Sequence, residues 1–180
     1  MQVALVTGAH RENEVLEAVN LAIRNARCAN VPIIFIQHNH AAFAPMMKGS
    51  EGWEIHAALD REVDDLIIEK EASDAFYGTE LEKRLVGLGV SIVVISGMQS
   101  EYCVDATCRA ALSRDLDVVL IADGHTTGPS YLPASDIVAH HNVVLANLAH
   151  PRVKLSAIPA AEIDFDDLQP SPNNSLQRTH

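Results

Sequence analysis

The sequence predicts a three-layer α/β/α fold with a mostly parallel, Rossmann-like sheet. Two observations support this prediction. Short apolar runs without polar alternation recur along the chain, as is typical of strands buried on both faces, and segments with helical periodicity separate them. The chain has 180 residues, 48% of them hydrophobic and 21% charged, and is long enough to bury one full core.

The first half of the chain alternates between helical and extended patterns. Apolar residues at helical spacing predict the first helix, which ends before Pro32, and the strands are continuous apolar runs. The expected elements are a helix over residues 13–30, a strand over 33–36, an irregular stretch over 41–52, a short helix over 53–59 and a strand over 66–68.

The second half continues the alternation. Thr79 is the expected N-cap of its first helix, with Glu82 completing a capping box, and Gly89 ends that helix. The expected elements are a helix over residues 79–88, a strand over 92–95, a helix over 104–112, a strand over 118–121, a helix over 134–148 and a strand over 153–158. We expect one domain over residues 1–165 and a disordered polar tail over 166–180.

Composition excludes several classes of partner. The net charge of −11 argues against nucleic acid and anionic membrane surfaces, and no apolar run is long enough to span a bilayer. Three widely spaced cysteines form no disulfide framework and suit a reducing, cytoplasmic location. Of these, Cys28 is expected on a helix face turned toward the core. With nucleic acid and membranes excluded, we expect the partner of this protein to be a small-molecule substrate.

Cys103 is the first candidate for chemistry. It follows the apolar strand 92–95 and a Ser-Gly pair, and it precedes the helical residues 104–112, so it is expected in the first helical turn at the carboxyl edge of a strand. Backbone N–H groups there favour a thiolate and can hold a developing oxyanion. The alternative is a cysteine buried between helix and sheet.

Lys70 is the second candidate, because it ends another apolar run and would lie at the same edge of the sheet. A cysteine and a lysine there form a plausible nucleophile and cationic partner. Taken alone, Lys70 is better interpreted as a solvated lysine at a strand end.

A dinucleotide site at the N-terminus is excluded. Residues 3–9 (VALVTGA) look like the opening of a short-chain dehydrogenase, but the further glycines that let the backbone approach a pyrophosphate are absent. Acidic Glu12 and Glu14 follow instead, and no tyrosine is followed by a lysine at the spacing of that family's catalytic pair.

With Cys103 and Lys70 placed, the chain resembles the isochorismatase-like cysteine hydrolases, which include nicotinamidases and N-carbamoylsarcosine amidases. The matching segments are residues 49–55 (GSEGWEI), 70–79 (KEASDAFYGT) and 97–104 (GMQSEYCV). The resemblance implies a catalytic aspartate, lysine and cysteine, of which Lys70 and Cys103 carry over. It also implies a cis peptide bond between Met98 and Gln99, and an oxyanion hole formed by the backbone N–H groups of Gln99 and Cys103.

The aspartate of the family pattern does not carry over. Only Met1-Gln2 matches the end of that pattern, so the aspartate would fall immediately before Met1. We therefore expect a chain truncated at the N-terminus, without the first, central strand. On this interpretation residues 3–6 follow the missing strand and need not form one.

We also predict which residues surround the expected site. Trp53, Phe76, Tyr102 and His125 are candidates to line a substrate pocket, although core packing is the more common fate of aromatic residues. Three histidines, His38, His40 and His56, suggest zinc, but their spacing lacks a fixed short pattern with a carboxylate, and we expect no metal and no other cofactor.

Two functional hypotheses remain open. The first is a cysteine-dependent hydrolase of a small amide, carbamoyl or related C–N substrate, acting through a thioacyl-type intermediate and forming a homo-oligomer. The second is a catalytically inactive scaffold or assembly subunit, because the aspartate lies outside this chain and its lack removes the general base.

Overall fold

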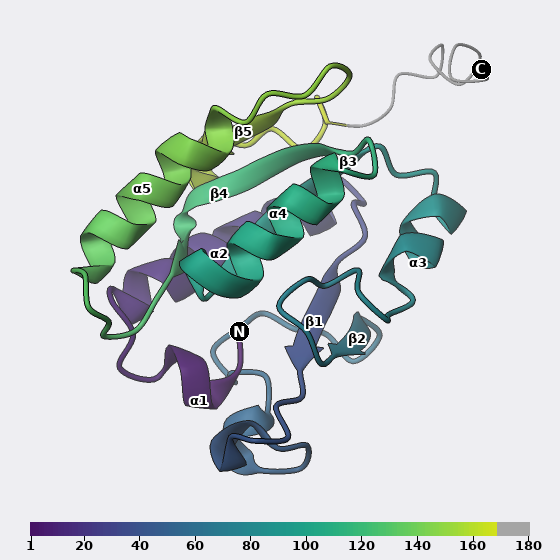
Figure 1. Ribbon diagram of the computed structural model, residues 1–180. Coiled ribbons are helices and arrows are strands. Elements are labelled where there is room, and N and C mark those ends of the chain that lie inside the picture. The colour runs from purple at the N-terminus through teal and green to yellow at the C-terminus, as the bar shows by residue number, and fades with distance from the viewer. Residues whose placement is uncertain (169–180) are drawn as a thin grey trace.

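The computed structural model describes residues 1–168 and contains two parallel sheets (Figure 1). In one sheet β1 (Ile34–His38) pairs with β2 (Leu66–Lys70). In the other, β4 (Asp117–Thr126) lies between β3 (Ile92–Met98) and β5 (Leu155–Ile158). Every pair is parallel, which confirms the predicted α/β class.

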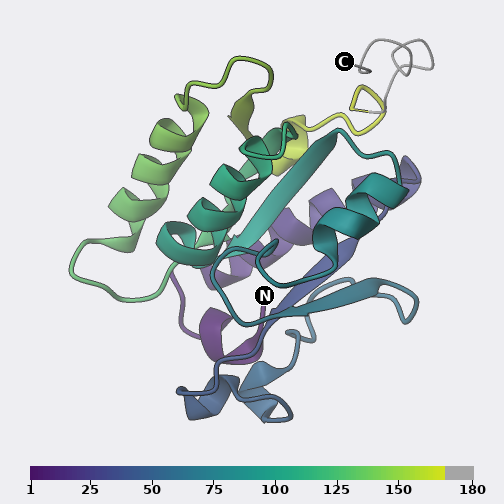
Figure 2. The same ribbon diagram turned by 45° about the vertical axis from the view of Figure 1, so that its right-hand side comes forward.

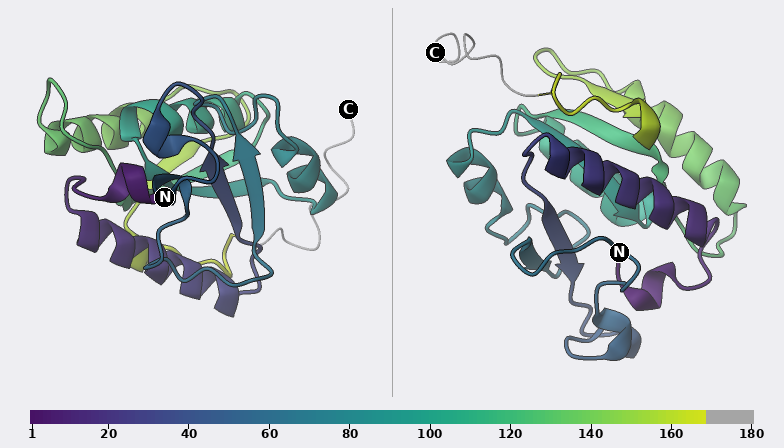
Figure 3. Two further views of the ribbon diagram at one scale, coloured as in Figure 1. Left: turned by 90° about the horizontal axis from the view of Figure 1, so that it is seen from below. Right: turned by 180° about the vertical axis from the view of Figure 1, so that it is seen from behind.

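Helices cover both faces of the sheets. The long α2 (Glu12–Cys28) lies across one face, as Figure 3 shows from behind, and packs on β4. The opposite face is covered by α3 (Leu81–Gly87), α4 (Asp105–Leu112) and α5 (Ala134–Ala146). The shorter elements are α1 (Val3–Val6), η1 (Ala44–Met46), η2 (Glu51–Trp53), η3 (Ser100–Val104) and η4 (Ala160–Glu162).

Strand β4 shows how one apolar run serves two layers. Val118 and Leu120 belong to the hydrophobic cluster shared with α3, α4 and α5, whereas Val119 and Ile121 belong to the cluster shared with α2. All four are buried, because successive side chains of a strand point to opposite faces and both faces here are covered.

Several predicted elements differ from the observed ones. Residues 53–59 form no helix: η2 ends at Trp53, Ile55 pairs with Gln2 in an isolated bridge, and a turn follows at residues 57–58. Residues 3–6 are helical, as expected for a segment that is not a strand. Helix α3 begins at Leu81 with Glu80 at its N-cap, one residue later than the predicted N-cap Thr79, whose hydroxyl accepts a hydrogen bond from the Leu81 N–H at 3.2 Å.

The chain reaches the end of the predicted domain with Phe165 buried against the α2 layer. Residues 166–168 form a turn, and the rest of the predicted tail, residues 169–180, lies outside the described residues. Within residues 1–168 no helix is both long and apolar enough to cross a membrane.

A cavity separates the two sheets. We call it the slot. It is lined on one side by residues 33–36 of the β1 segment and on the other by residues 92–98 of β3, and it has a volume of about 440 Å³. Figure 2 shows β1 and β2 set apart from the three-stranded sheet, with the N-terminus between them. The same cavity is also lined by His38 and Lys70, the last residues of β1 and β2, and by Cys103.

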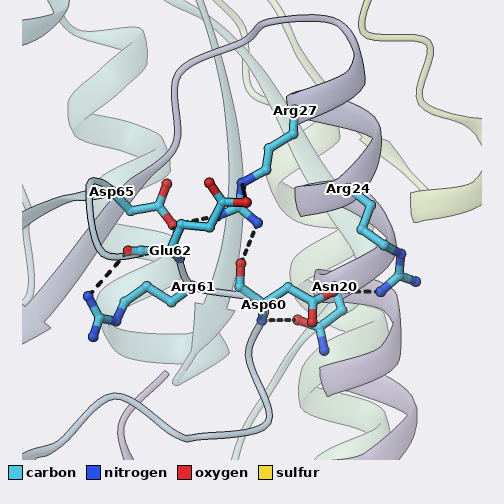
Figure 4. Close-up of polar contacts among 7 residues, drawn as sticks. All are labelled: Asn20, Arg24, Arg27, Asp60, Arg61, Glu62 and Asp65. Atoms are coloured by element: carbon cyan, nitrogen blue, oxygen red, sulfur yellow. Dashed lines mark hydrogen bonds and ion pairs between the residues drawn. The ribbon is translucent and has the colours of Figure 1, made fainter.

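A polar cluster holds the two sheets together across the slot (Figure 4). Helix α2 packs on β4, and its Arg27 reaches the loop that leads into β2, pairing with Asp65 at 2.5 Å and with the Asp60 carbonyl at 2.5 Å. Asn20 adds two hydrogen bonds, to the Ala58 carbonyl at 2.7 Å and from the Asp60 N–H at 2.8 Å. The loop is therefore fixed to a helix that packs on β1 and on β4 of the other sheet.

Replacing Arg27 should weaken this connection more than replacing its neighbour Arg24. The Arg27 side chain is 24% exposed and its partner Asp65 11% exposed, so Arg27→Ala leaves a carboxylate short of a partner in a half-buried site and should cost about 1.5–3 kcal/mol. Arg24 pairs with Asp60 at 2.6 Å but is 56% exposed, so Arg24→Ala should cost about 1 kcal/mol or less. Urea denaturation measures both, and equal losses would contradict this assignment.

Candidate active site

The carboxyl ends of β1, β2 and β3 meet at one edge of the fold. His38 and Lys70 are paired in register at the ends of β1 and β2, and Cys103 follows the end of β3. All three residues line the slot. The structure therefore brings together the two residues that the sequence predicts and a third, His38, beside them.

Cys103 lies in a π-helical turn rather than in an ordinary first turn of α-helix. The Gln99 carbonyl accepts hydrogen bonds from the N–H groups of Tyr102 at 3.1 Å and Val104 at 3.2 Å, and the wider turn continues directly into α4. Insertions of this kind are frequent at functional sites. The half-buried Cys103 thiol lies 3.8 Å from His38 Nδ1.

A buried chain of hydrogen bonds supports this turn from behind. The Ser100 hydroxyl, at the start of the turn, pairs with His125 Nδ1 at 2.8 Å, and His125 Nε2 pairs with the Asn142 side-chain oxygen at 3.0 Å. Asn142 in turn donates to the Ala122 carbonyl at 2.9 Å. Burial lowers the pKa of His125, although its bond to Asn142 opposes the shift. These hydrogen bonds connect the turn that contains Cys103 to β4 and α5.

Lys70 is buried, which sets it apart from a solvated lysine at a strand end. Only 5% of the residue is exposed, and its ammonium group donates to the Ser73 carbonyl at 2.5 Å. The loop after β2 therefore folds back over its side chain. A buried positive charge acts strongly on neighbouring titratable groups because little water screens it.

His38 is the residue whose place sequence reasoning missed. Burial and the Lys70 charge both lower its pKa, and a hydrogen bond to the Glu71 backbone opposes them. The neutral imidazole is therefore favoured at neutral pH. The sequence signal for His38 is its position after a predicted strand, similar to the signal that identifies Lys70, whereas the sequence analysis assigns His38 only to a candidate zinc site.

Gln2 holds His38 in place through the backbone. Its side-chain amide donates to the His38 carbonyl at 3.0 Å and accepts from the His38 N–H at 2.8 Å, and it also donates to the Trp53 carbonyl at 2.7 Å. Gln2 is buried, so these bonds satisfy polar groups that water does not reach.

The peptide bond between Met98 and Gln99 is cis, at the position that the resemblance implies. Of the N–H groups in this turn, those of Tyr102 and Val104 are bonded to the Gln99 carbonyl. The oxyanion role of the Gln99 and Cys103 N–H groups stays a prediction.

The four residues predicted to line a substrate pocket lie in different environments. Phe76 lines the cavity but is buried in the core under Arg114, whose guanidinium lies 4.5 Å from the ring centre. Trp53 donates through its indole N–H to the Asn39 side chain at 2.5 Å, and Tyr102 is exposed. His125 is buried behind the cysteine turn, because β4 extends past the predicted strand and carries it inside.

The three histidines considered for zinc do not converge. His38 faces Cys103, His40 contacts His38 with ring centres 5.7 Å apart, and His56 Nδ1 accepts from the Ala58 N–H at 3.3 Å. Over residues 1–168 no group of three or more histidine, cysteine or acidic side chains is placed to hold a metal ion.

The other two cysteines differ sharply from Cys103. Cys108 is buried, and burial, with the nearby Asp105 carboxylate, raises its pKa to about 12, so it is inert at neutral pH. Cys28 is exposed, which corrects the expectation that it faces the core. The buried stripe of α2 runs through Ile23 and Ala26, and Cys28, two residues beyond Ala26, lies on nearly the opposite side of the helix.

The sequence is similar to a known protein family and to several characterised proteins. A family model described as the isochorismatase domain matches residues 1–150. A streptothricin hydrolase of Streptomyces noursei is 32% identical over 130 residues, which cover 71% of this chain and 47% of that protein. The chain thus spans about half the length of that relative.

Two further matches cover a larger share of the related protein. Nicotinamidase 3 of Arabidopsis thaliana is 26% identical over 151 residues, which cover 76% of this chain and 70% of that protein. A crystal structure of an isochorismatase family protein superposes with a TM-score of 0.73 at 30% identity and covers 83% of this chain and 87% of the other.

Acidification should destabilise the protein through His125. Because the pKa of His125 is lowered in the folded state, the unfolded state binds the proton first as pH falls below about 6.5, and the free energy of unfolding then decreases. His125→Gln removes this titration, so its stability should depend less steeply on pH between about 6.5 and 5.5 than that of the wild type. Urea denaturation at several pH values gives the two slopes, and equal slopes would contradict the assignment.

Proposed function

Because the chain belongs to the isochorismatase family, we propose that it is a cysteine-dependent hydrolase that cleaves the C–N bond of a small amide or carbamoyl substrate. The observation that supports this most directly is the contact between the Cys103 thiol and His38 Nδ1 at 3.8 Å, beside the buried Lys70. The names of two relatives, streptothricin hydrolase and nicotinamidase, agree with hydrolysis as the reaction class.

In this proposal His38 accepts the thiol proton. The carboxylates nearest to Cys103 along the chain are engaged elsewhere: Glu101 accepts from the Thr127 hydroxyl at 2.8 Å, and Asp105 pairs with Arg109 at 2.9 Å. The bond to the Glu71 backbone raises the pKa of His38, as a carbonyl acceptor does. In the tautomer that the mechanism requires, Nε2 carries the proton and Nδ1 accepts from Cys103.

The reaction then proceeds in two stages. The Cys103 proton moves to His38, the thiolate attacks the substrate carbonyl carbon, and the charge of Lys70 stabilises the thiolate. The C–N bond breaks, the leaving nitrogen takes the proton from His38, and the acyl group stays on sulfur as a thioester. Water, deprotonated by His38, attacks the thioester carbonyl, and the departing thiolate recovers the proton as the acid is released.

Replacing Cys103 tests the nucleophile. Cys103→Ser should lower kcat/KM by about 10³-fold or more on any small amide that the wild-type protein hydrolyses, because the serine hydroxyl is not ionised by this environment. The exposed Cys28 lies outside the cavity, so Cys28→Ser should keep the wild-type rate. Steady-state hydrolysis over a panel of small amides and carbamoyl compounds gives both values. A Cys103→Ser variant with an unchanged rate would refute the proposal.

His38 should set the acid limb of the pH profile. Activity should fall as pH drops through the pKa of His38, which lies below 6.5, because the protonated ring no longer accepts the thiol proton. His38→Gln should lose about 10²-fold or more in kcat and should lack this limb, whereas His40→Gln, at an exposed neighbour, should keep it. A His38→Gln variant that retains the wild-type pH profile would show that another group takes the proton.

The alternative of a catalytically inactive scaffold is favoured by one observation, the open slot beside the site. The two hypotheses differ in a simple measurement on the chain that starts at Met1. Turnover of any amide in the panel that depends on Cys103 refutes the scaffold. Alkylation of Cys103 without turnover of any compound favours it, because a reactive thiol can persist without catalysis.

A further inference from the structure

The turn that carries Cys103 has an unusual hydrogen-bond register. In an α-helix the Val104 N–H would bond to the Ser100 carbonyl, four residues back. Here it bonds to the Gln99 carbonyl, five residues back, and the Asp105 N–H reaches the Ser100 carbonyl in the same way. Each of these two bonds therefore spans one residue more than the bonds of the α-helix α4 that follows.

This register decides where the Cys103 thiol points. A slip back to α-helical bonding would rotate Cys103 about the helix axis by about 100°, the rotation that belongs to one residue. The thiol would then leave its position 3.8 Å from His38 Nδ1. Single π-helical turns are rare, so contacts beyond the turn's own backbone bonds are needed to hold this one.

Two side chains anchor the turn to the end of β4. The Ser100 hydroxyl pairs with His125 Nδ1 at 2.8 Å, and the Glu101 carboxylate accepts from the Thr127 hydroxyl at 2.8 Å. Thr127 is itself fixed, because its carbonyl accepts from the His10 N–H at 3.1 Å. His125 lies in β4 and Thr127 directly follows it, so adjacent residues of the turn are tied to the same end of one strand.

The hydrogen bonds behind Ser100 have a fixed direction. The Ala122 carbonyl can only accept, so the Asn142 side chain donates to it at 2.9 Å and presents its oxygen to His125 Nε2 at 3.0 Å. That oxygen can only accept, so Nε2 carries the proton, and Nδ1 of the neutral ring accepts from the Ser100 hydroxyl. One backbone carbonyl thus sets the direction of the whole series.

A charged His125 does not fit this series. With protons on both ring nitrogens, Nδ1 would face the Ser100 hydroxyl as a donor, and that hydroxyl would have to turn its own proton elsewhere. Ser100 is 0% exposed, so solvent does not reach it to accept that proton. Burial also lowers the pKa of His125, which keeps the ring neutral near pH 7.

Other titratable groups lie near His125 without being its hydrogen-bond partners. The charge of His141 on α5 lowers the pKa of His125, and the charge of Asp123 on β4 raises it. Glu101 of the turn is held by a threonine hydroxyl, and β3, whose Gly97 is in register with His125, carries no titratable side chain. The direct contacts of the ring are therefore with neutral groups.

We propose that His125, acting through Ser100, locks the turn in the register that directs the Cys103 thiol into the site. His125 is buried and does not line the slot, so it is a positioning residue and not a catalytic one. A variant that charges the ring should release the turn, as a variant that removes the ring does. This inference rests on the proposed role of Cys103 as the nucleophile.

Alkylation of Cys103 reports on the turn without any substrate. Ser100→Ala and His125→Leu should slow its reaction with iodoacetamide at about pH 7.5 by about tenfold or more, because the thiol loses the neighbours that favour its ionised form. His125→Asn should lose less than His125→Leu, because its amide oxygen can accept from Ser100 in place of Nδ1. Cys28, exposed outside the slot, is the reference in the same protein and should keep its rate. Peptide mass spectrometry gives both rates.

A second variant tests the direction of the hydrogen bonds rather than their presence. Asn142→Asp keeps the size of the side chain, but its carboxylate favours the charged form of His125 and so raises the pKa of the ring. The Cys103 rate relative to wild type should be lowest near about pH 6.5 and should rise toward about pH 8.5, as the ring loses its proton. His140→Gln, at an exposed histidine of the same helix, should match the wild type at every pH.

The outcomes decide this proposal separately from the proposed hydrolysis. Slower alkylation of Cys103 at an unchanged Cys28 rate, with a relative rate that rises with pH in Asn142→Asp, supports it. If thermal unfolding shows that the Ser100 or His125 variants do not fold, Asn142→Asp decides alone. An unchanged Cys103 rate in these variants, or a relative rate in Asn142→Asp that does not vary with pH, would overturn it. Hydrolysis that survives Cys103→Ser would instead refute the nucleophile, which the alkylation rates do not measure.

Discussion

The shared direction of the strands is the constraint on which the rest of this structure depends. Because β1, β2 and β3 all run the same way, their carboxyl ends gather His38, Lys70 and Cys103 at one edge, although these residues are 65 positions apart at the extremes. Antiparallel pairing would have sent one of the three to the opposite end of the molecule. The site is thus a consequence of topology before any side chain contributes to it.

Burial then gives the three side chains their chemical character. Lys70 is enclosed by the loop after β2, so its charge is weakly screened and lowers the pKa of His38 beside it. A neutral imidazole next to a thiol can accept a proton, whereas an imidazolium cannot. Cys108, only five residues after Cys103, is inert because burial, with the nearby Asp105 carboxylate, raises its pKa to about 12. Environment separates two cysteines that occupy the same helical segment.

The slot and the site belong to one continuous cavity, and this connects stability to function. Helix α2 contacts the loop before β2 through the polar cluster around Arg27, and Gln2 lines the cavity beside His38.

By itself the sequence determined the parallel α/β class, the strands that end at Lys70 and before Cys103, and the family resemblance, because apolar runs, helical spacing and short motifs are local properties of the chain. It placed residues 53–59 in a helix and Cys28 in the core, because local periodicity does not record which face finds a partner. Only the tertiary structure decided that His38 faces Cys103, that His125 lies behind the cysteine turn, and that β1 and β3 face each other across a slot. Those facts depend on contacts between residues far apart in the chain, and such contacts are fixed by packing and strand order rather than by any local pattern.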